Sequence, residues 1–362
     1  MSHDTLQDTL IEDSAAKLFS TQVDKDRRLR AETGEWDAAL WAQVADSGFH
    51  LLLASEASGG YGQGWTAAYP LLRGLGYWQV PLPLAETMVA AQLASAAGFD
   101  IPDGPLTLME QGQGNQLTVA DGDGLATLSG TAHAVPWARH ARAAMVSLQD
   151  GRLALLDLQG APGVQVQPHH NHAGLPSDTL VLQQARLQAV ARNPLALDRP
   201  VWTLGALARS AMLVGALESA LEQAVRYAGE RVQFGKAIGK YQAIQQQLAL
   251  MAGDVSAARV ATQVALADAP GGDQSSCAAT HFSTAVAKVR AGEAATRGTS
   301  IAHQVHGAIG FTHEHALHFA TRRLWAWREE FGTDAAWAAE LGRAAIAARA
   351  AGFWPGITAK TF

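Results

Sequence analysis

Apolar positions recur at helical spacing, with polar positions between them, in the first hundred residues of the chain. The first apolar positions lie three to five residues apart, at Leu6, Leu10, Ala15 and Leu18. Similar patterns predict helices at about residues 36–45 and 65–75. Between them, the glycine-rich SGGYGQG at 58–64 predicts a loop. We therefore expect an N-terminal helical domain over residues 1–104.

The period changes to that of strands between about residues 105 and 195. Short β-type runs flank a turn at 121–124, and AAMVSLQDGRLALLDL predicts a hairpin whose turn holds Asp150 and Gly151. DTLVL is a further short strand. Several short strands separated by turn signals predict a small barrel or sandwich over residues 105–195.

Helical spacing returns after a linker at 192–200 that carries two prolines. Three apolar stripes follow, at Leu213, Leu217, Leu221 and Val225, at Ile244, Leu248, Met251 and Val255, and at Phe282, Val286 and Val289. An alanine-rich run at 335–351 predicts a fourth helix. The pattern predicts a four-helix bundle over 196–362. The expected fold class is therefore α+β, with an N-terminal helical domain, a middle β-barrel or sandwich and a C-terminal four-helix bundle.

Composition narrows the classes of function. The net charge is −6, from 27 Lys plus Arg against 33 Asp plus Glu, which argues against a nucleic-acid-binding protein. Cys277 is the only cysteine, so no disulfide framework is possible, and we expect a cytoplasmic location. We see no apolar run of the ~20 residues that a membrane span needs. His169, His170 and His172 predict a polar loop rather than a metal site.

Two motifs carry the chemistry. RVQFG at 231–235 precedes a long helix-forming run that begins at Gln242, and QVHGAIGF occupies 304–311. Together they resemble the C-terminal helical domain of the acyl-CoA dehydrogenase flavoproteins, whose order of helices, β domain and helical bundle matches the order expected here. The resemblance implies FAD as the cofactor and an acyl-CoA thioester as the substrate.

The resemblance assigns cofactor-binding roles to six residues. Arg231 would bind the FAD pyrophosphate, because a guanidinium fork makes charge-assisted bonds to phosphate oxygens, and Phe234 would lie near the adenine. In the second motif the corresponding residues are Gln304 and Gly307, with Ala308 where a second glycine is usual, and Gly310 matches the last glycine of the motif. Both elements would reach the cofactor of a neighbouring subunit. Thr333 is the sixth residue, and it belongs to the loop 329–333, which comes after the second motif in the sequence. The plainer interpretation is that Arg231 and Gln304 are surface polar residues on helices.

The catalytic base that the family needs is displaced in this sequence. Removal of an acyl α-proton requires a positioned carboxylate. Counting from Arg322, Phe331 occupies the position of the usual Glu, and Glu330 lies one residue earlier. A second family position falls at about Gly205, and residues 201–217 contain no Asp or Glu. Glu330 is the candidate base if the loop shifts by one residue. Otherwise Glu329 and Glu330 would form a solvated acidic pair near Arg328.

The stretches that would cradle the flavin ring are also altered. The first becomes TLMEQGQG at 107–114 and the second GTAHAVPWARHA at 130–141. Trp137 is either a residue that stacks near the flavin ring or an ordinary aromatic at the edge of the barrel.

These features predict a subunit that contributes half of a flavin site. By resemblance, the chain would be the partner without the usual base in an α2β2 heterotetramer acting on a bulky acyl-CoA, such as a steroid side-chain thioester, with electron-transfer flavoprotein or a similar acceptor. The alternatives are a homotetrameric dehydrogenase using Glu330, a flavin-free scaffold on the same fold, and a related flavoenzyme such as a monooxygenase or nitroalkane oxidase.

Overall fold

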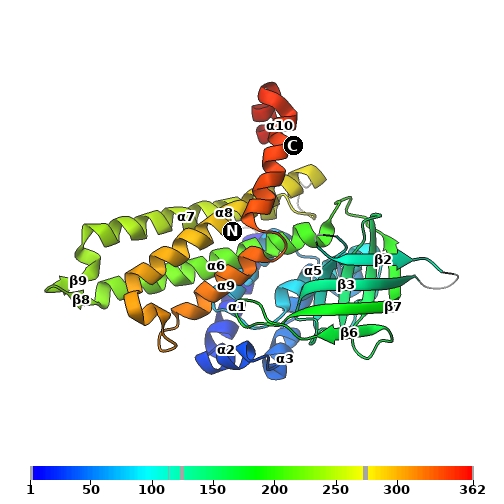
Figure 1. The fold of residues 1–362 in the computed structure, drawn as a ribbon, viewed down its shortest axis with the longest axis horizontal. Coiled ribbons are helices and arrows are strands. Elements are labelled where there is room, and N and C mark those ends of the chain that lie inside the picture. Colours follow the sequence, from blue (N-terminus) through cyan, green and yellow to red (C-terminus); the bar gives the residue numbers. More distant parts are fainter. Residues whose placement is uncertain (1–2, 113, 123–125, 272–275, 361–362) are drawn as a thin grey trace. The chain divides into compact units, whose positions relative to one another are not determined.

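The chain, seen here in a computed structural model, runs from helices through strands to helices (Figure 1). The structure describes residues 3–112, 114–122, 126–271 and 276–360. Two compact units contain them. A helical unit comprises Met1–Arg28, Tyr69–Val80 and Ala206–Phe362, and a sheet unit comprises Leu29–Ala68 and Pro81–Gly205. The expected fold class is confirmed. The domain boundaries at 104 and 195 stay a prediction.

The helical unit is built mainly of helices, several of which lie side by side while the last projects away from them (Figure 1). They are α1 (His3–Gln22), most of α4 (Trp65–Tyr77), most of α6 (Pro200–Glu230), α7 (Gln242–Ala267), α8 (Cys277–His306), α9 (Leu317–Glu329) and α10 (Asp334–Ala359). Short elements join them: the hairpin β8 (Val232–Gln233) and β9 (Lys236–Ala237), and the 3-10 turns η3 (Ile238–Lys240) and η4 (Gly307–Phe311). Helix α2 (Lys25–Glu32) is shared between the units.

Helix α6 is the apolar centre of this unit. It has the length and composition of a membrane span, but 83% of its most apolar stretch is buried, as in a core helix. Leu213 and Leu217 are fully buried as predicted, whereas Val225 is 52% exposed, so the stripe was wrong at its end. Each step of four residues advances about 400° around a helix, so a strict four-residue repeat drifts off the buried face. Ala224 and Ala228 are buried there instead.

Helix α10 projects beyond the other helices of its unit (Figure 1). Trp337 is buried near its start. Arg349 has a φ of 57° and divides the helix into two arms. The Lys360 ammonium then donates to Asp268 at 2.7 Å, which anchors the end of the second arm at the end of α7.

The sheet unit contains one curled seven-stranded sheet. Its strands are β1 (Leu106–Glu110), β2 (Gln116–Ala120), β3 (Thr127–Pro136), β4 (Ala143–Ser147), β5 (Arg152–Asp157), β6 (Val164–Gln167) and β7 (Ser177–Arg192), in the order β1-β4-β5-β7-β3-β2 with β6 also on β7. The first half of β7 pairs with β3 and β6, and its second half pairs with β5. This long strand therefore joins both halves of the sheet around one apolar core.

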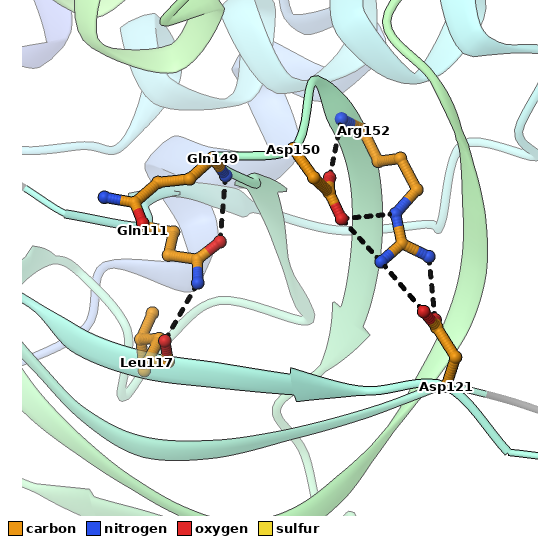
Figure 2. Close-up of polar contacts among 6 residues, drawn as sticks. All are labelled: Gln111, Leu117, Asp121, Gln149, Asp150 and Arg152. Atoms are coloured by element: carbon orange, nitrogen blue, oxygen red, sulfur yellow. Dashed lines mark hydrogen bonds and ion pairs between the residues drawn. The ribbon is translucent and has the colours of Figure 1, made fainter.

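The predicted hairpin between β4 and β5 is confirmed, and polar contacts hold its turn (Figure 2). The Arg152 guanidinium donates to Asp150 at 2.8 Å and to Asp121 at 2.8 Å. On the other side, the Gln149 amide donates to Gln111 at 2.9 Å. The predicted turn at 121–124 lies partly outside the described residues, which resume at residue 126.

Helices complete the sheet unit. They are α3 (Ala38–Asp46), the 3-10 turns η1 (Phe49–Leu51) and η2 (Glu56–Ser58), and α5 (Leu84–Ala97). Helix α5 packs against β1 and is buried along most of its length. The predicted helices at 36–45 and 65–75 correspond to α3 and α4, and the glycine-rich segment between them forms irregular structure after η2.

Candidate active site and family

Arg231 lies directly after α6, where the chain turns into the β8–β9 hairpin. Its amide donates to the Tyr227 carbonyl at 2.8 Å, and its carbonyl accepts from the Ile238 amide at 2.8 Å. The hairpin turn consists of Phe234 and Gly235, with φ values of 52° and 84°. Two successive positive φ angles are typical of a tight hairpin turn, but they are exceptional for a phenylalanine. Phe234 is 91% exposed at this tip.

A pocket of about 790 Å³ opens beside this hairpin. Three segments far apart in the sequence line it: the end of α6, the hairpin with the start of α7, and the α8–η4 junction. It brings together five of the six predicted cofactor-binding residues, namely Arg231, Phe234, Gln304, Gly307 and Ala308. Gly310 is buried behind it, and a Cβ there would meet the Cβ of His306 at 2.9 Å, so packing favours glycine at that position.

The charge of the pocket is concentrated on one side chain. Arg231 is the one Lys or Arg among the lining residues, which include no Asp or Glu. No hydrogen bond or ion pair occupies its guanidinium within the described ranges. His306 also lines the pocket, stacked on Tyr227 with ring centroids 4.7 Å apart. Burial lowers the pKa of His306, and the nearby His315 and His303 lower it further. The walls are therefore aromatic and uncharged near neutral pH, with a single fixed cation.

Thr333 lies apart from that pocket, at the corner between α9 and α10. Its hydroxyl accepts from the Ala336 amide at 3.0 Å and so caps the start of α10. This is the usual role of a threonine at such a position.

Glu330, the candidate base, is at the same corner and is held by an ion pair. The Arg209 guanidinium donates to its carboxylate at 2.6 Å, and the two side chains are only 2% and 10% exposed. The guanidinium carbon also lies 5.5 Å from the centre of the Phe331 ring. The solvated acidic pair that the sequence offered as the alternative is therefore wrong, because Glu330 is largely buried and Arg328 pairs with Asp334 at 3.0 Å.

A second buried cation completes the corner. Lys288 is fully buried on α8, and its ammonium donates to the carbonyls of Trp327 at 2.9 Å and Arg328 at 2.8 Å. These carbonyls end α9, where the helix dipole is negative. Burial lowers the pKa of Lys288 to about 7, and the nearby Glu330 carboxylate opposes that shift. Arg209, Glu330 and Lys288 thus form a buried charge cluster that fixes the α9–α10 corner on α6 and α8.

In the sheet unit, two polar side chains of the stretch at 107–112 are buried, those of Thr107 and Glu110. The buried Thr107 hydroxyl donates to the Pro136 carbonyl. Glu110 accepts from the Trp202 amide at 2.9 Å in the first turn of α6. Burial raises the pKa of Glu110 to about 7, although the Trp202 amide and the nearby Ser147 hydroxyl oppose the rise. Trp137 is 4% exposed and packs on Trp36, with ring centroids 6.4 Å apart, as expected of a barrel aromatic.

Known proteins share both the sequence and the fold. Residues 202–346 match the family model for the acyl-CoA dehydrogenase C-terminal domain. The acyl-CoA dehydrogenase FadE27 of Mycobacterium tuberculosis is 29% identical over 86% of this chain and 88% of its own. Residues 202–346 therefore correspond to an acyl-CoA dehydrogenase C-terminal domain, and the chain is similar to acyl-CoA dehydrogenases over most of its length.

Solved structures of this family extend the match to nearly the whole chain. A chain of the Tcur3481-Tcur3483 steroid acyl-CoA dehydrogenase (G363A variant) has a TM-score of 0.85 at 27% identity, covering 96% of this chain and 99% of its own. The ChsE4-ChsE5 complex from Mycobacterium tuberculosis has a TM-score of 0.79 at 23% identity, covering 96% and 98%, which shows the shared fold. These similarities confirm the resemblance drawn from the two motifs and indicate an oxidoreductase of this type.

Sequence reasoning missed several residues of the pocket and the corner. Tyr227 lies one helical turn before Arg231, so the i, i+4 rule could have placed it on the same face. Tyr241 also lines the pocket and directly precedes Gln242, the first residue of α7. Arg209 was detectable as a lone cation in an apolar run, a pattern that signals a buried charge with a partner elsewhere. The identity of that partner, 121 residues away, carried no sequence signal.

Proposed function

We propose that this chain is an FAD-dependent acyl-CoA dehydrogenase subunit, and that it is the partner without the catalytic base in an α2β2 heterotetramer that desaturates an acyl-CoA thioester. One contrast carries the proposal. The pocket predicted to contact a neighbour's cofactor brings together five of the six predicted residues, whereas the nearest candidate base is committed to a buried ion pair.

The pocket residues fit the pyrophosphate and adenine end of FAD. Arg231 has a guanidinium available for a bidentate bond to phosphate oxygens. The aromatic rings of Tyr227, Phe234 and Tyr241 offer flat apolar surfaces for a purine. Gln304 supplies an exposed amide, and the small side chain of Ala308 leaves room for the cofactor at the pocket wall. Bound FAD would supply the oxidising equivalent for the desaturation, and these residues would hold the cofactor in place.

The base would come from the partner subunit. Glu330 is bound to Arg209, and freeing it would leave a cation that is 2% exposed without its counter-ion. The other family position falls on Gly205, which has no side chain to offer. Abstraction of the acyl α-proton needs a positioned carboxylate. A base on the partner subunit would leave this chain to hold the cofactor.

The relatives make a heteromeric assembly with a bulky substrate the preferred form. Two solved structures on this fold, ChsE4-ChsE5 and Tcur3481-Tcur3483, are named as pairs, and the second is a steroid enzyme. We accordingly propose a steroid side-chain or similarly bulky acyl-CoA as the substrate class. Electron-transfer flavoprotein or a similar acceptor would reoxidise the flavin, and the location would be cytoplasmic.

The decisive experiment measures flavin content. The chain is purified alone and after co-expression with a neighbouring subunit that carries the base, and FAD per chain is read from the visible spectrum. We expect little flavin alone and about one FAD per two chains in the complex. A yellow protein with about one FAD per chain when purified alone would favour the homotetramer using Glu330, and a colourless complex would favour the flavin-free scaffold.

A matched pair of variants tests the pocket itself. Arg231→Ala should lower the FAD content of the complex by at least ~10-fold, because it removes a charge-assisted bond to phosphate worth more than ~1.4 kcal/mol. Arg226→Ala is the control, since Arg226 is an exposed arginine of α6, five residues before Arg231 and outside the pocket. Equal flavin content in the two variants would refute the role of Arg231.

A further inference from the structure

His306 is a buried histidine in the wall of the pocket beside Arg231. It is the last residue of α8 and lines the pocket, although only 3% of it is exposed. The Tyr227 ring stacks on its imidazole with centroids 4.7 Å apart and planes at 22°, and the His315 ring lies 4.5 Å away. Tyr227 precedes Arg231 by one turn of α6. The imidazole is therefore fixed beside the helix end that carries Arg231.

One ring nitrogen of His306 is used and the other is not. Nδ1 lies 2.7 Å from the Ala302 carbonyl oxygen, one turn back along α8. A carbonyl oxygen can only accept, so Nδ1 carries a proton, and Nε2 of the neutral ring is then an unprotonated acceptor. Nε2 is buried and has no hydrogen-bond partner among the residues that the structure describes. Because buried polar atoms are normally paired, this nitrogen points to a group that binds in the pocket.

The surroundings of His306 favour its neutral form. Burial lowers its pKa, the nearby His315 and His303 lower it further, and only the bond to the Ala302 carbonyl raises it. Glu314 is exposed and is not among the groups that shift this pKa. The titratable side chains around the pocket are Tyr227 and Arg231 of α6, Tyr241 before α7, His303 of α8, His313, Glu314 and His315 before α9, and His318 of α9.

The ligand proposed for this pocket carries more charge than Arg231 alone can neutralise. The pyrophosphate of a dinucleotide is a diester with two negative charges near neutral pH, whereas Arg231 is the one Lys or Arg among the described lining residues. The last carbonyls of α8 add partial negative charge at the same wall. A protonated His306 would supply a second cation, and the phosphate would give its Nε2 hydrogen an acceptor.

We propose that His306 is a proton-linked pyrophosphate-binding residue. Its Nε2 takes up one proton from solvent when a dinucleotide binds, and the resulting N–H donates to a phosphate oxygen. The proton returns to solvent when the ligand leaves, and no covalent bond to carbon or phosphorus changes. The inference rests on the flavin pocket proposed above, to which it adds a binding residue and a pH dependence.

The direction of the pH dependence follows from the linkage. Because the bound anion raises the pKa of His306, the affinity rises as pH falls through the pKa of the bound state, and the gain is complete below the lowered pKa of the free pocket. An opposite charge within about 4–6 Å raises the pKa of a cationic group by about 1–3, and a difference of one is tenfold in affinity. We therefore expect the affinity to rise at least ~10-fold from about pH 8.5 to about pH 5.5.

The test uses ADP-ribose as the probe and the full chain purified alone. ADP-ribose has the adenosine and the pyrophosphate diester of FAD, and it has no group that titrates in this pH range. Calorimetric titrations in two buffers of different ionisation enthalpy give both Kd and the number of protons taken up. We expect proton uptake at intermediate pH together with the fall in Kd toward acid pH.

Three variants assign the proton. His306→Gln should hold Kd constant within ~2-fold across the range and abolish proton uptake, because it removes the titrating ring. His313→Gln is the control, an exposed histidine outside the pocket lining, and it should keep the natural pH dependence. His315→Gln leaves His306 in place but removes a neighbour that lowers its pKa, so the rise in affinity should move to higher pH. This third variant covers misfolding of His306→Gln.

The results separate this proposal from the flavin pocket itself. If the natural protein binds ADP-ribose with the same Kd at every pH and without proton uptake, His306 has no such role. A pH dependence that persists in His306→Gln, or that His313→Gln removes equally, would also refute it. In each of these cases the pocket still binds a pyrophosphate. Failure of the natural protein to bind ADP-ribose at any pH would refute the pocket and the role of His306 together.

Discussion

Replacement of Glu110 by glutamine should remove a pH dependence from the stability of the sheet unit. Glu110 is buried at the end of β1, and burial raises its pKa from 4.5 to about 7. A group whose pKa is raised by folding favours the folded state while it is protonated. Its contribution is fully present below the unfolded pKa and is lost as pH rises through the folded pKa.

The size of the effect follows from the two pKa values. A difference of about 2.5, from 4.5 to about 7, corresponds to about 3 kcal/mol of unfolding free energy. Most of it, roughly 2.5 kcal/mol, should be lost between about pH 5 and about pH 8. Glutamine is uncharged and can still accept a hydrogen bond from the Trp202 amide. The unfolding free energy of Glu110→Gln relative to the natural protein should therefore rise by that amount between these two pH values.

The assay is urea unfolding followed by tryptophan fluorescence at a series of pH values and a fixed protein concentration. Glu56→Gln is the matched control, because Glu56 is an exposed carboxylate of the same unit. The quantity to compare is the difference in unfolding midpoint between variant and natural protein. A Glu110→Gln difference that stays flat from acid to alkaline pH, like that of Glu56→Gln, would refute a buried carboxyl with a raised pKa.

Two further variants test the helical unit. Gly215→Ala should cost more than ~2 kcal/mol of unfolding free energy, because its Cβ would lie 1.9 Å from the Arg73 carbonyl oxygen. Gly229→Ala is the control in the same helix, and it should be neutral or stabilising because its Cβ would meet open space. Similar melting temperatures for the two variants would contradict the close approach of the helices at Gly215. Arg209→Met should lower the unfolding free energy by about 3–5 kcal/mol, because it removes the guanidinium that pairs with the Glu330 carboxylate. Glu330→Gln in the heteromer should change kcat by less than ~10-fold. A fall in kcat of ~1,000-fold would identify Glu330 as the base.

The sequence by itself determined the elements and the family. Period two over 105–195 produced strands, and the Asp150–Gly151 turn formed the predicted hairpin, because local backbone preferences decide such turns. The motifs around Arg231 and Gln304 identified the family through short segments in which order and spacing are enough. Their meeting in one pocket agrees with that identification, although the resemblance and not the spacing had predicted it.

Only the tertiary structure decided what the buried charges do. Whether Glu330 is solvated or paired depends on Arg209, which lies 121 residues away on another helix. The sequence places Glu110 in a stretch expected to cradle the flavin ring, whereas in the structure its carboxylate accepts a hydrogen bond from the first turn of α6. Periodicity reports which face of a helix is apolar, but not which of two apolar faces has a partner. For α7, packing against α8 left the Leu250–Val260 side exposed, because burial depends on contacts between segments that no local pattern contains.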